Sequence, residues 1–141
     1  MVQSEGAILR IVEGFKDRTL PSGEWNHEAH LITALWAHTN FNADEAVCFM
    51  RAGIITYNAS SGGRNTATEG YHETMTLFWC RVIDGYVKAH KDKPLLYLCQ
   101  DFLKSEWSSK DLPLRYYSKE RLFSTKARAM WLEPDLKLFL E

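Results

Sequence analysis

Residues 27–38, HEAHLITALWAH, are the stretch that decides the fold. Apolar residues and histidines recur in it at i, i+3, i+4 and i+7, which is the spacing of a helix face that packs against a core. The members of this stripe are His27, His30, Leu31, Ala34, Leu35 and His38. We therefore expect a helix over residues 24–38 whose first two histidines point inward.

A second helix that carries a histidine is predicted further along the chain. Thr66-Ala-Thr-Glu69 has the form of a capping box, which predicts a long helix from residue 66 to about His90. One face of this helix carries His72, Met75, Thr76, Trp79, Ile83 and Tyr86. His72 is therefore also expected to point inward.

Helical signals continue through the rest of the chain. Apolar periodicity predicts a helix over residues 4–16, the cap at Asn42 predicts one to about residue 57, and Pro94 begins another. Shorter helices are expected at 114–123 and 124–131, each with a serine cap, and strand signals are weak. We predict an all-α, single-domain bundle over residues 1–141, with four to five main helices, short C-terminal helices and an irregular tail.

Composition narrows the class of protein. The chain has 17 basic and 18 acidic residues, so its net charge of −1 gives no reason to expect nucleic acid or an anionic membrane as a partner. The three cysteines are widely separated, which fits reduced thiols in a cytoplasmic protein. No apolar run approaches a membrane span of about 20 residues. The apolar tail at 136–140 is expected to dock on its own core or on a second subunit, which leaves a homo-oligomer open.

The histidine clusters predict a metal site between the two helices. Residues three or four apart share one side of a helix, so His27 and His30 can face His72 and Glu73. Histidine and carboxylate ligands suit a divalent transition metal such as Zn, Fe, Mn or Cu. Glu24 or Glu69 would orient the imidazoles from behind. This metal-binding protein is the leading interpretation.

Catalytic roles follow if the protein is an enzyme. The metal would polarise a substrate oxygen or activate water, and Glu73 or Tyr71 would move the proton. Arg121 is the first candidate to hold an acidic substrate, because guanidinium binds carboxylates and phosphates through two hydrogen bonds.

Two alternatives stay open. The same polar residues would line a metal-free pocket for a small molecule, as an enzyme, binder or sensor, together with Trp25, Trp36, Trp79 and Tyr86. They would otherwise form a structural network of buried hydrogen bonds. For His38 and His90, at helix C-termini, we expect ordinary hydrogen-bonded residues.

Three motifs together resemble a family of small, uncharacterised, helical bacterial proteins. They are Trp25-x-His27-x-x-His30-Leu31, Tyr71-His72-Glu73-Thr74-x-Thr76 and Arg115-Tyr116-Tyr117-Ser118-x-Glu120-Arg121-Leu122-Phe123-Ser124. The resemblance covers roughly residues 25–134 and implies that the three segments belong to one domain. It carries no activity over to this chain.

Overall fold

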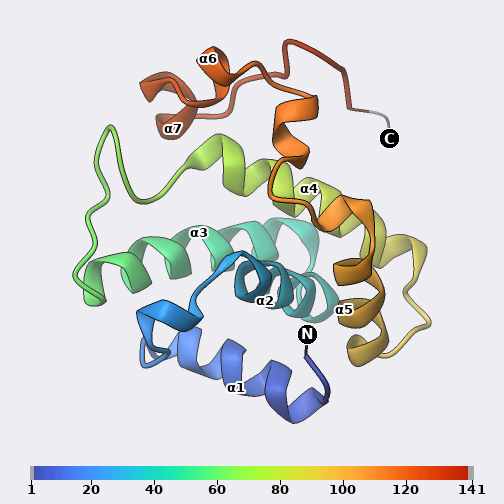
Figure 1. Ribbon diagram of the computed structural model, residues 1–141. Coiled ribbons are helices and arrows are strands. Elements are labelled where there is room, and N and C mark those ends of the chain that lie inside the picture. The colour runs from blue at the N-terminus through green and yellow to red at the C-terminus, as the bar shows by residue number, and fades with distance from the viewer. Residues whose placement is uncertain (1, 140–141) are drawn as a thin grey trace.

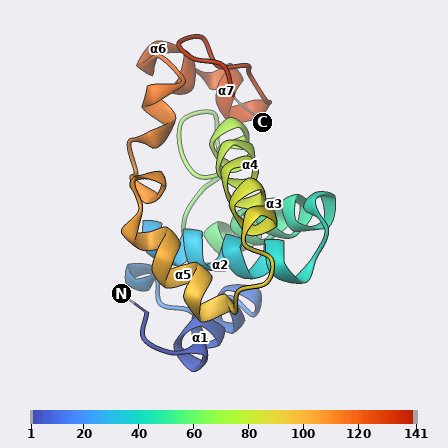
Figure 2. The same ribbon diagram turned by 90° about the vertical axis from the view of Figure 1, so that its right-hand side faces the viewer.

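Helix α2 (His27–Asn40) is the element around which the other long helices pack. It contacts α1 (Glu5–Lys16), α3 (Ala43–Ser60), α4 (Glu73–Ala89) and α5 (Leu95–Lys104) in the computed structural model, which describes residues 2–139. Figure 1 shows α1 on one side of α2 and α3, with α4 on the opposite side. The view at right angles in Figure 2 has the same order of layers. The described residues contain no strand, so the predicted all-α bundle is confirmed.

The C-terminal quarter of the chain covers the outer side of α4. It consists of short elements, η2 (Glu106–Ser108), η3 (Leu112–Arg115), α6 (Lys119–Leu122) and α7 (Thr125–Ala129). A separate apolar cluster joins this segment to α4, and its buried members are Phe78, Leu112, Tyr116, Tyr117 and Leu122. Burial of these large side chains is the main force that fixes such short helices, because isolated helices of four or five residues are unstable in water.

Side-chain caps begin most of the helices where the sequence predicts them. Ser4 caps α1, Asn42 and Glu45 form a reciprocal capping box at α3, and Ser118 and Ser124 cap α6 and α7. Each cap satisfies a backbone N–H that the first turn of the helix leaves without a partner.

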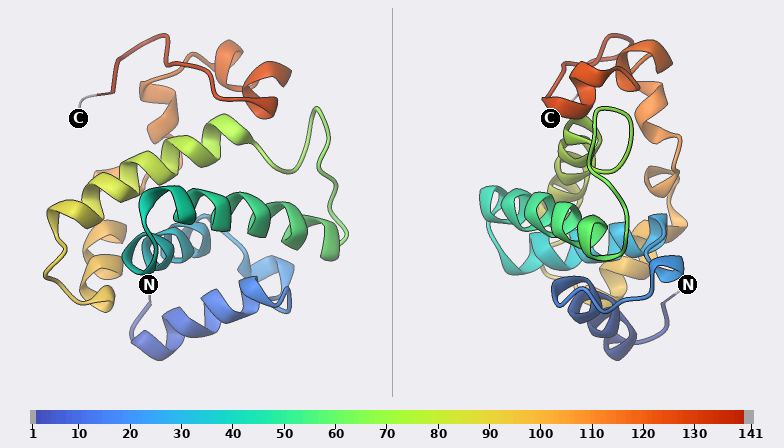
Figure 3. Two further views of the ribbon diagram at one scale, coloured as in Figure 1. Left: turned by 180° about the vertical axis from the view of Figure 1, so that it is seen from behind. Right: turned by 90° about the vertical axis from the view of Figure 1, so that its left-hand side faces the viewer.

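The predicted bounds of three helices are wrong, and one of them, expected over 114–123, is divided into η3 and α6. Helix α2 begins at His27 with Asn26 as its cap, and Glu24 lies before it in the short η1 (Ser22–Glu24). Helix α4 begins at Glu73 rather than at residue 66. Gly70 has φ +84, a left-handed conformation that interrupts a helix, so residues 61–72 form a loop. Figure 3 shows this loop running from α3 toward the C-terminal helices.

The tail docks on its own chain as far as it is described. Phe139 packs against Phe78 and Tyr116, with ring centroids 5.3 and 4.9 Å apart, and Leu140 lies outside the described residues. Cys80 and Cys99 are buried free thiols, whereas Cys48 is exposed. Within residues 2–139, no helix is both long and apolar enough to cross a membrane.

Candidate functional site

A cavity of about 520 Å³ lies where α2, α3, α4 and the C-terminal segment meet. Helix α2 contributes His27, His30, Leu31 and Ala34 to its lining. Helices α3 and α4 contribute Met50, Ile54, Asn58, Met75, Trp79 and Cys80. The cavity therefore has mainly apolar walls with a few polar side chains among them.

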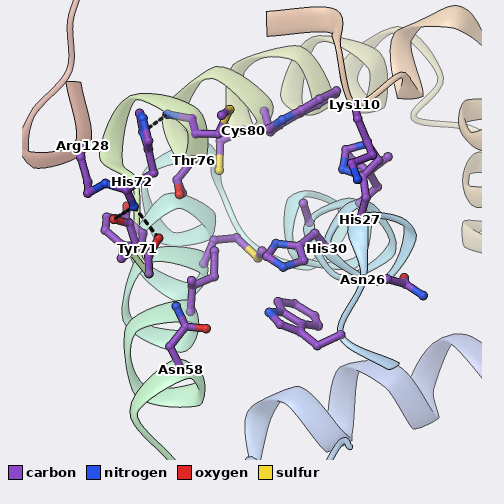
Figure 4. A pocket seen from close by; sticks show the side chains of 18 of the residues that line it. Asn26, His27, His30, Asn58, Tyr71, His72, Thr76, Cys80, Lys110 and Arg128 are labelled. Carbon is purple, nitrogen blue, oxygen red and sulfur yellow. Dashed lines mark hydrogen bonds between the residues drawn. The ribbon is translucent and has the colours of Figure 1, made fainter. Parts of the chain in front are cut away.

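Loops and the C-terminal segment complete the lining. Trp25 and Asn26 precede α2, and Tyr71 and His72 precede α4. Lys110, Phe123 and Arg128 come from the C-terminal segment. Figure 4 shows His30 between two sides of the cavity, one carrying Arg128 and the other carrying Lys110.

His30 is a polar side chain of the cavity lining without a hydrogen bond among the described residues. Its ring stacks on Trp25 at a centroid distance of 4.0 Å, and the Trp25 ring stacks on Phe15 at 4.5 Å. No hydrogen bond to either imidazole nitrogen is present among residues 2–139. Burial lowers the pKa of His30 to about 4, so the ring is neutral at pH 7 and offers one N–H and one lone pair.

Trp25 contributes a second polar group without a partner. Its indole Nε1 is buried and meets no acceptor within the described part of the chain. A buried N–H without a partner is rare in proteins and is usually explained by water or a ligand.

His72 is held by hydrogen bonds at both ring nitrogens. The backbone N–H of Met75 donates to Nδ1 at 3.1 Å, which makes His72 the cap of α4. Nε2 therefore carries the proton and donates to the backbone carbonyl of Leu122 at 2.8 Å. Neither nitrogen keeps a lone pair for a metal, so this histidine connects α4 to α6.

His27 is also engaged. Its Nε2–H donates to the carbonyl of Ser108 at 2.8 Å, and its ring meets Trp79 edge-on at 5.2 Å. Burial lowers the pKa of His27, and the nearby Lys110 ammonium lowers it further. Only Nδ1 of this ring is left to accept a bond.

Glu73 is directed toward α3 and does not line the cavity. Its carboxylate pairs with Arg51, with Nε to Oε1 at 3.0 Å and Nη2 to Oε2 at 2.6 Å. The Tyr71 hydroxyl donates to the same carboxylate at 2.6 Å. The Arg51 guanidinium, followed by the Tyr71 hydroxyl, holds the pKa of Glu73 below its usual range, so this group is a fixed anion in an ion pair.

The four predicted metal ligands do not converge on one point. Within residues 2–139, no group of three or more histidine, cysteine, aspartate or glutamate side chains is arranged to hold a metal ion. Glu24 pairs instead with Arg10 at 2.7 Å, and Glu69 lies in the exposed loop. Metal binding therefore stays a prediction, and this arrangement gives it no support.

The three predicted catalytic residues are likewise dispersed. Tyr71 lines the cavity, but Glu73 does not, and Arg121 donates from Nε to the carbonyl of Glu133 at 2.6 Å outside it. Arg128 is the arginine of this segment that lines the cavity. Burial raises the pKa of the cavity thiol of Cys80 to about 12, so it is no thiolate nucleophile at neutral pH.

His38 and His90 each have a hydrogen-bond partner at Nδ1, as expected, although the buried Nε2 of His38 has none within the described residues. His38 Nδ1 lies 3.2 Å from the Asp84 carboxylate, and His90 Nδ1 lies 2.9 Å from the carbonyl of Tyr86. Of the four aromatic residues predicted for a pocket, Trp25 and Trp79 line the cavity. Trp36 packs instead against Phe41 and Phe49, and Tyr86 donates to Asp101.

Sequence reasoning missed several lining residues. Met50, Ile54 and Asn58 follow at intervals of four along α3, so a polar residue continues an apolar stripe. A polar residue at a position where the stripe calls for an apolar one could have indicated a cavity wall. Lys110 and Phe123 had no such signal, because only the path of the C-terminal segment brings them to the cavity.

No family model, no curated protein and no solved structure significantly matches this chain.

Proposed function

We propose that this protein binds a small organic molecule, without a metal, in the cavity between α2, α3, α4 and the C-terminal segment. The observation that carries the proposal is a mainly apolar cavity of about 520 Å³ with an unpartnered imidazole, His30, in its lining. Binding pockets for small molecules typically measure about 300–1,000 Å³ and combine apolar walls with a few fixed polar groups.

The polar groups suit recognition better than acid–base catalysis. His30 is held in place by its stack on Trp25, so it presents a neutral donor and acceptor at little entropic cost. A general base works best with a pKa near the operating pH, and a pKa of about 4 makes His30 a weak one. The unpartnered indole N–H of Trp25 adds a donor at the same wall.

The metal interpretation has weaker support. Both ring nitrogens of His72 are engaged, and Glu73 is paired with Arg51. A metal at the predicted position would have to break these contacts, since a ligand nitrogen must offer a free lone pair.

The test is titration with the neutral fluorescent probe N-phenyl-1-naphthylamine. We expect wild-type protein to bind it and Ala34→Phe, which fills the cavity from α2, to bind at least about tenfold more weakly. Ala52→Phe, at an exposed position of α3, is the matched control and should bind like wild type. Equal binding by Ala34→Phe and wild type would place the probe elsewhere and overturn the proposal.

Elemental analysis distinguishes the metal interpretation. Untagged wild-type protein is measured by inductively coupled plasma mass spectrometry beside the double variant His27→Ala/His72→Ala. The proposal expects no stoichiometric metal in either protein. A metal present in wild type at one ion per chain and lost in the double variant would overturn the metal-free part of it.

A further inference from the structure

The charge of the cavity lining differs from that of the whole chain. The chain as a whole is nearly balanced, with 17 basic and 18 acidic residues. The lining contains two cations, Lys110 and Arg128, and no aspartate or glutamate. A partly enclosed space with cations and no carboxylate has a positive potential, which favours an anionic ligand.

Neither cation is neutralised by a carboxylate of the residues that the structure describes. Within residues 2–139, Lys110 and Arg128 form no ion pair with a carboxylate. This distinguishes them from Arg51, whose Nε and Nη2 both donate to the carboxylate of Glu73 outside the cavity lining.

Arg128 keeps part of its guanidinium available. Its Nη1 donates to the carbonyls of Gly70 and Tyr71, at 2.9 and 3.3 Å, and these bonds fix the side chain against the loop. Nε and Nη2 have no partner in the described part of the chain. These two groups form one edge of the guanidinium fork, and that edge matches the two oxygens of a carboxylate.

Flat rings form much of the remaining wall. Trp25 and His30 stack on each other, Trp79 contributes a second indole, and Phe123 adds a ring from the C-terminal segment. Aromatic walls favour a planar apolar body, which can stack or meet a ring edge-on.

Resting on the proposed function, we propose that the ligand of this cavity is an aromatic carboxylate. Its ring lies among the aromatic side chains, and its carboxylate is bound by Arg128, with Lys110 adding to the positive potential. Burial lowers the pKa of His72, and the Arg128 charge lowers it further, so the field of this cation reaches the cavity wall.

The experiment is isothermal titration calorimetry with 2-naphthoate and its neutral isostere 2-naphthamide. A charge-assisted hydrogen bond predicts that wild type binds the acid on the order of tenfold to a hundredfold more tightly than the amide. In Arg128→Gln most of that preference should be lost while binding of the amide is unchanged. Lys126→Gln removes the same charge from an exposed position of α7 and serves as the matched control.

The outcomes separate this inference from the proposed function. Equal binding of acid and amide by wild type would refute the anionic ligand and leave small-molecule binding intact. Binding of neither compound would overturn this inference, and it would overturn the proposed function as well if N-phenyl-1-naphthylamine also failed to bind. Lys110→Gln breaks no hydrogen bond of the described chain. This substitution should weaken binding of the acid and leave binding of the amide unchanged. If Arg128→Gln unfolds, the test rests on Lys110→Gln at low salt. If this variant still binds the acid in preference to the amide as strongly as wild type does, the inference is wrong.

Discussion

His72→Ala should destabilise the protein strongly even in the absence of any metal. The substitution removes the cap of α4, where the Met75 N–H donates to Nδ1 at 3.1 Å, and such a loss costs about 0.5–2 kcal/mol. It also leaves the carbonyl of the buried Leu122 without its donor at 2.8 Å, at a cost of about 1–3 kcal/mol. Because both losses occur together, we expect a reduction of about 2–4 kcal/mol in the free energy of unfolding.

Two matched variants test the reasoning. His72→Asn keeps a good cap but cannot reach Leu122, so it should recover about 1 kcal/mol of the loss. His30→Gln breaks no hydrogen bond and gives up only the stack on Trp25, so its cost should stay within about 1.5 kcal/mol. A metal site would instead make the two histidines behave alike.

The assay is urea unfolding followed by circular dichroism, with and without a chelator. The expected order of stability is wild type, His30→Gln, His72→Asn and His72→Ala, with no change on adding chelator. A chelator that lowered the free energy of unfolding of wild type to that of His72→Ala would refute this reasoning, because a ligand bound only by the native state stabilises that state.

Three further predictions concern stability. Because the pKa of His30 is about 4 when folded and near 6.5 when unfolded, the unfolded chain binds the extra proton as the pH falls from 6.5 to 4. Over that range, the free energy of unfolding of wild type should fall by up to about 3 kcal/mol more than that of His30→Gln. Urea unfolding at a series of pH values measures this difference, and equal losses in the two proteins would contradict the lowered pKa. Tyr57→Phe removes the bond of 2.6 Å to the carbonyl of Leu20 and should lower the free energy of unfolding by about 1–3 kcal/mol, whereas an unchanged midpoint would show that water replaces it. Gly53→Ala places a methyl group against the ring of Phe15 and should cost about 1–3 kcal/mol by thermal unfolding, and a stabilised protein would mean that this ring moves aside.

The helices could largely be predicted from the sequence because their signals are local. The cap at Asn42 and the reciprocal Glu45 are three residues apart, and the apolar stripe of α2 repeats within one turn. The prediction for the start of α4 was wrong, also for a local reason. Thr66 and Glu69 match a capping box, but Gly70 adopts φ +84 and ends the segment before a helix can form.

The candidate site was only half predictable. The residues His27, His30 and His72 line one cavity together with Trp25 and Trp79, but the convergence on one point that the sequence predicts is not supported. Their chemical roles depended on partners that no local pattern reveals. His27 donates to a carbonyl 81 residues away, and His72 donates to one 50 residues away.

The sequence by itself determined that this chain is a helical bundle with inward-facing histidines, since periodicity and caps act over a few residues. Only the tertiary structure decided which of these histidines are already satisfied, because the C-terminal segment that supplies Ser108 and Leu122 folds back over α4. That same path brings Arg128 to the cavity and leaves His30 without a partner in it. A hydrogen bond depends on distance in space, whereas a sequence pattern records only distance along the chain.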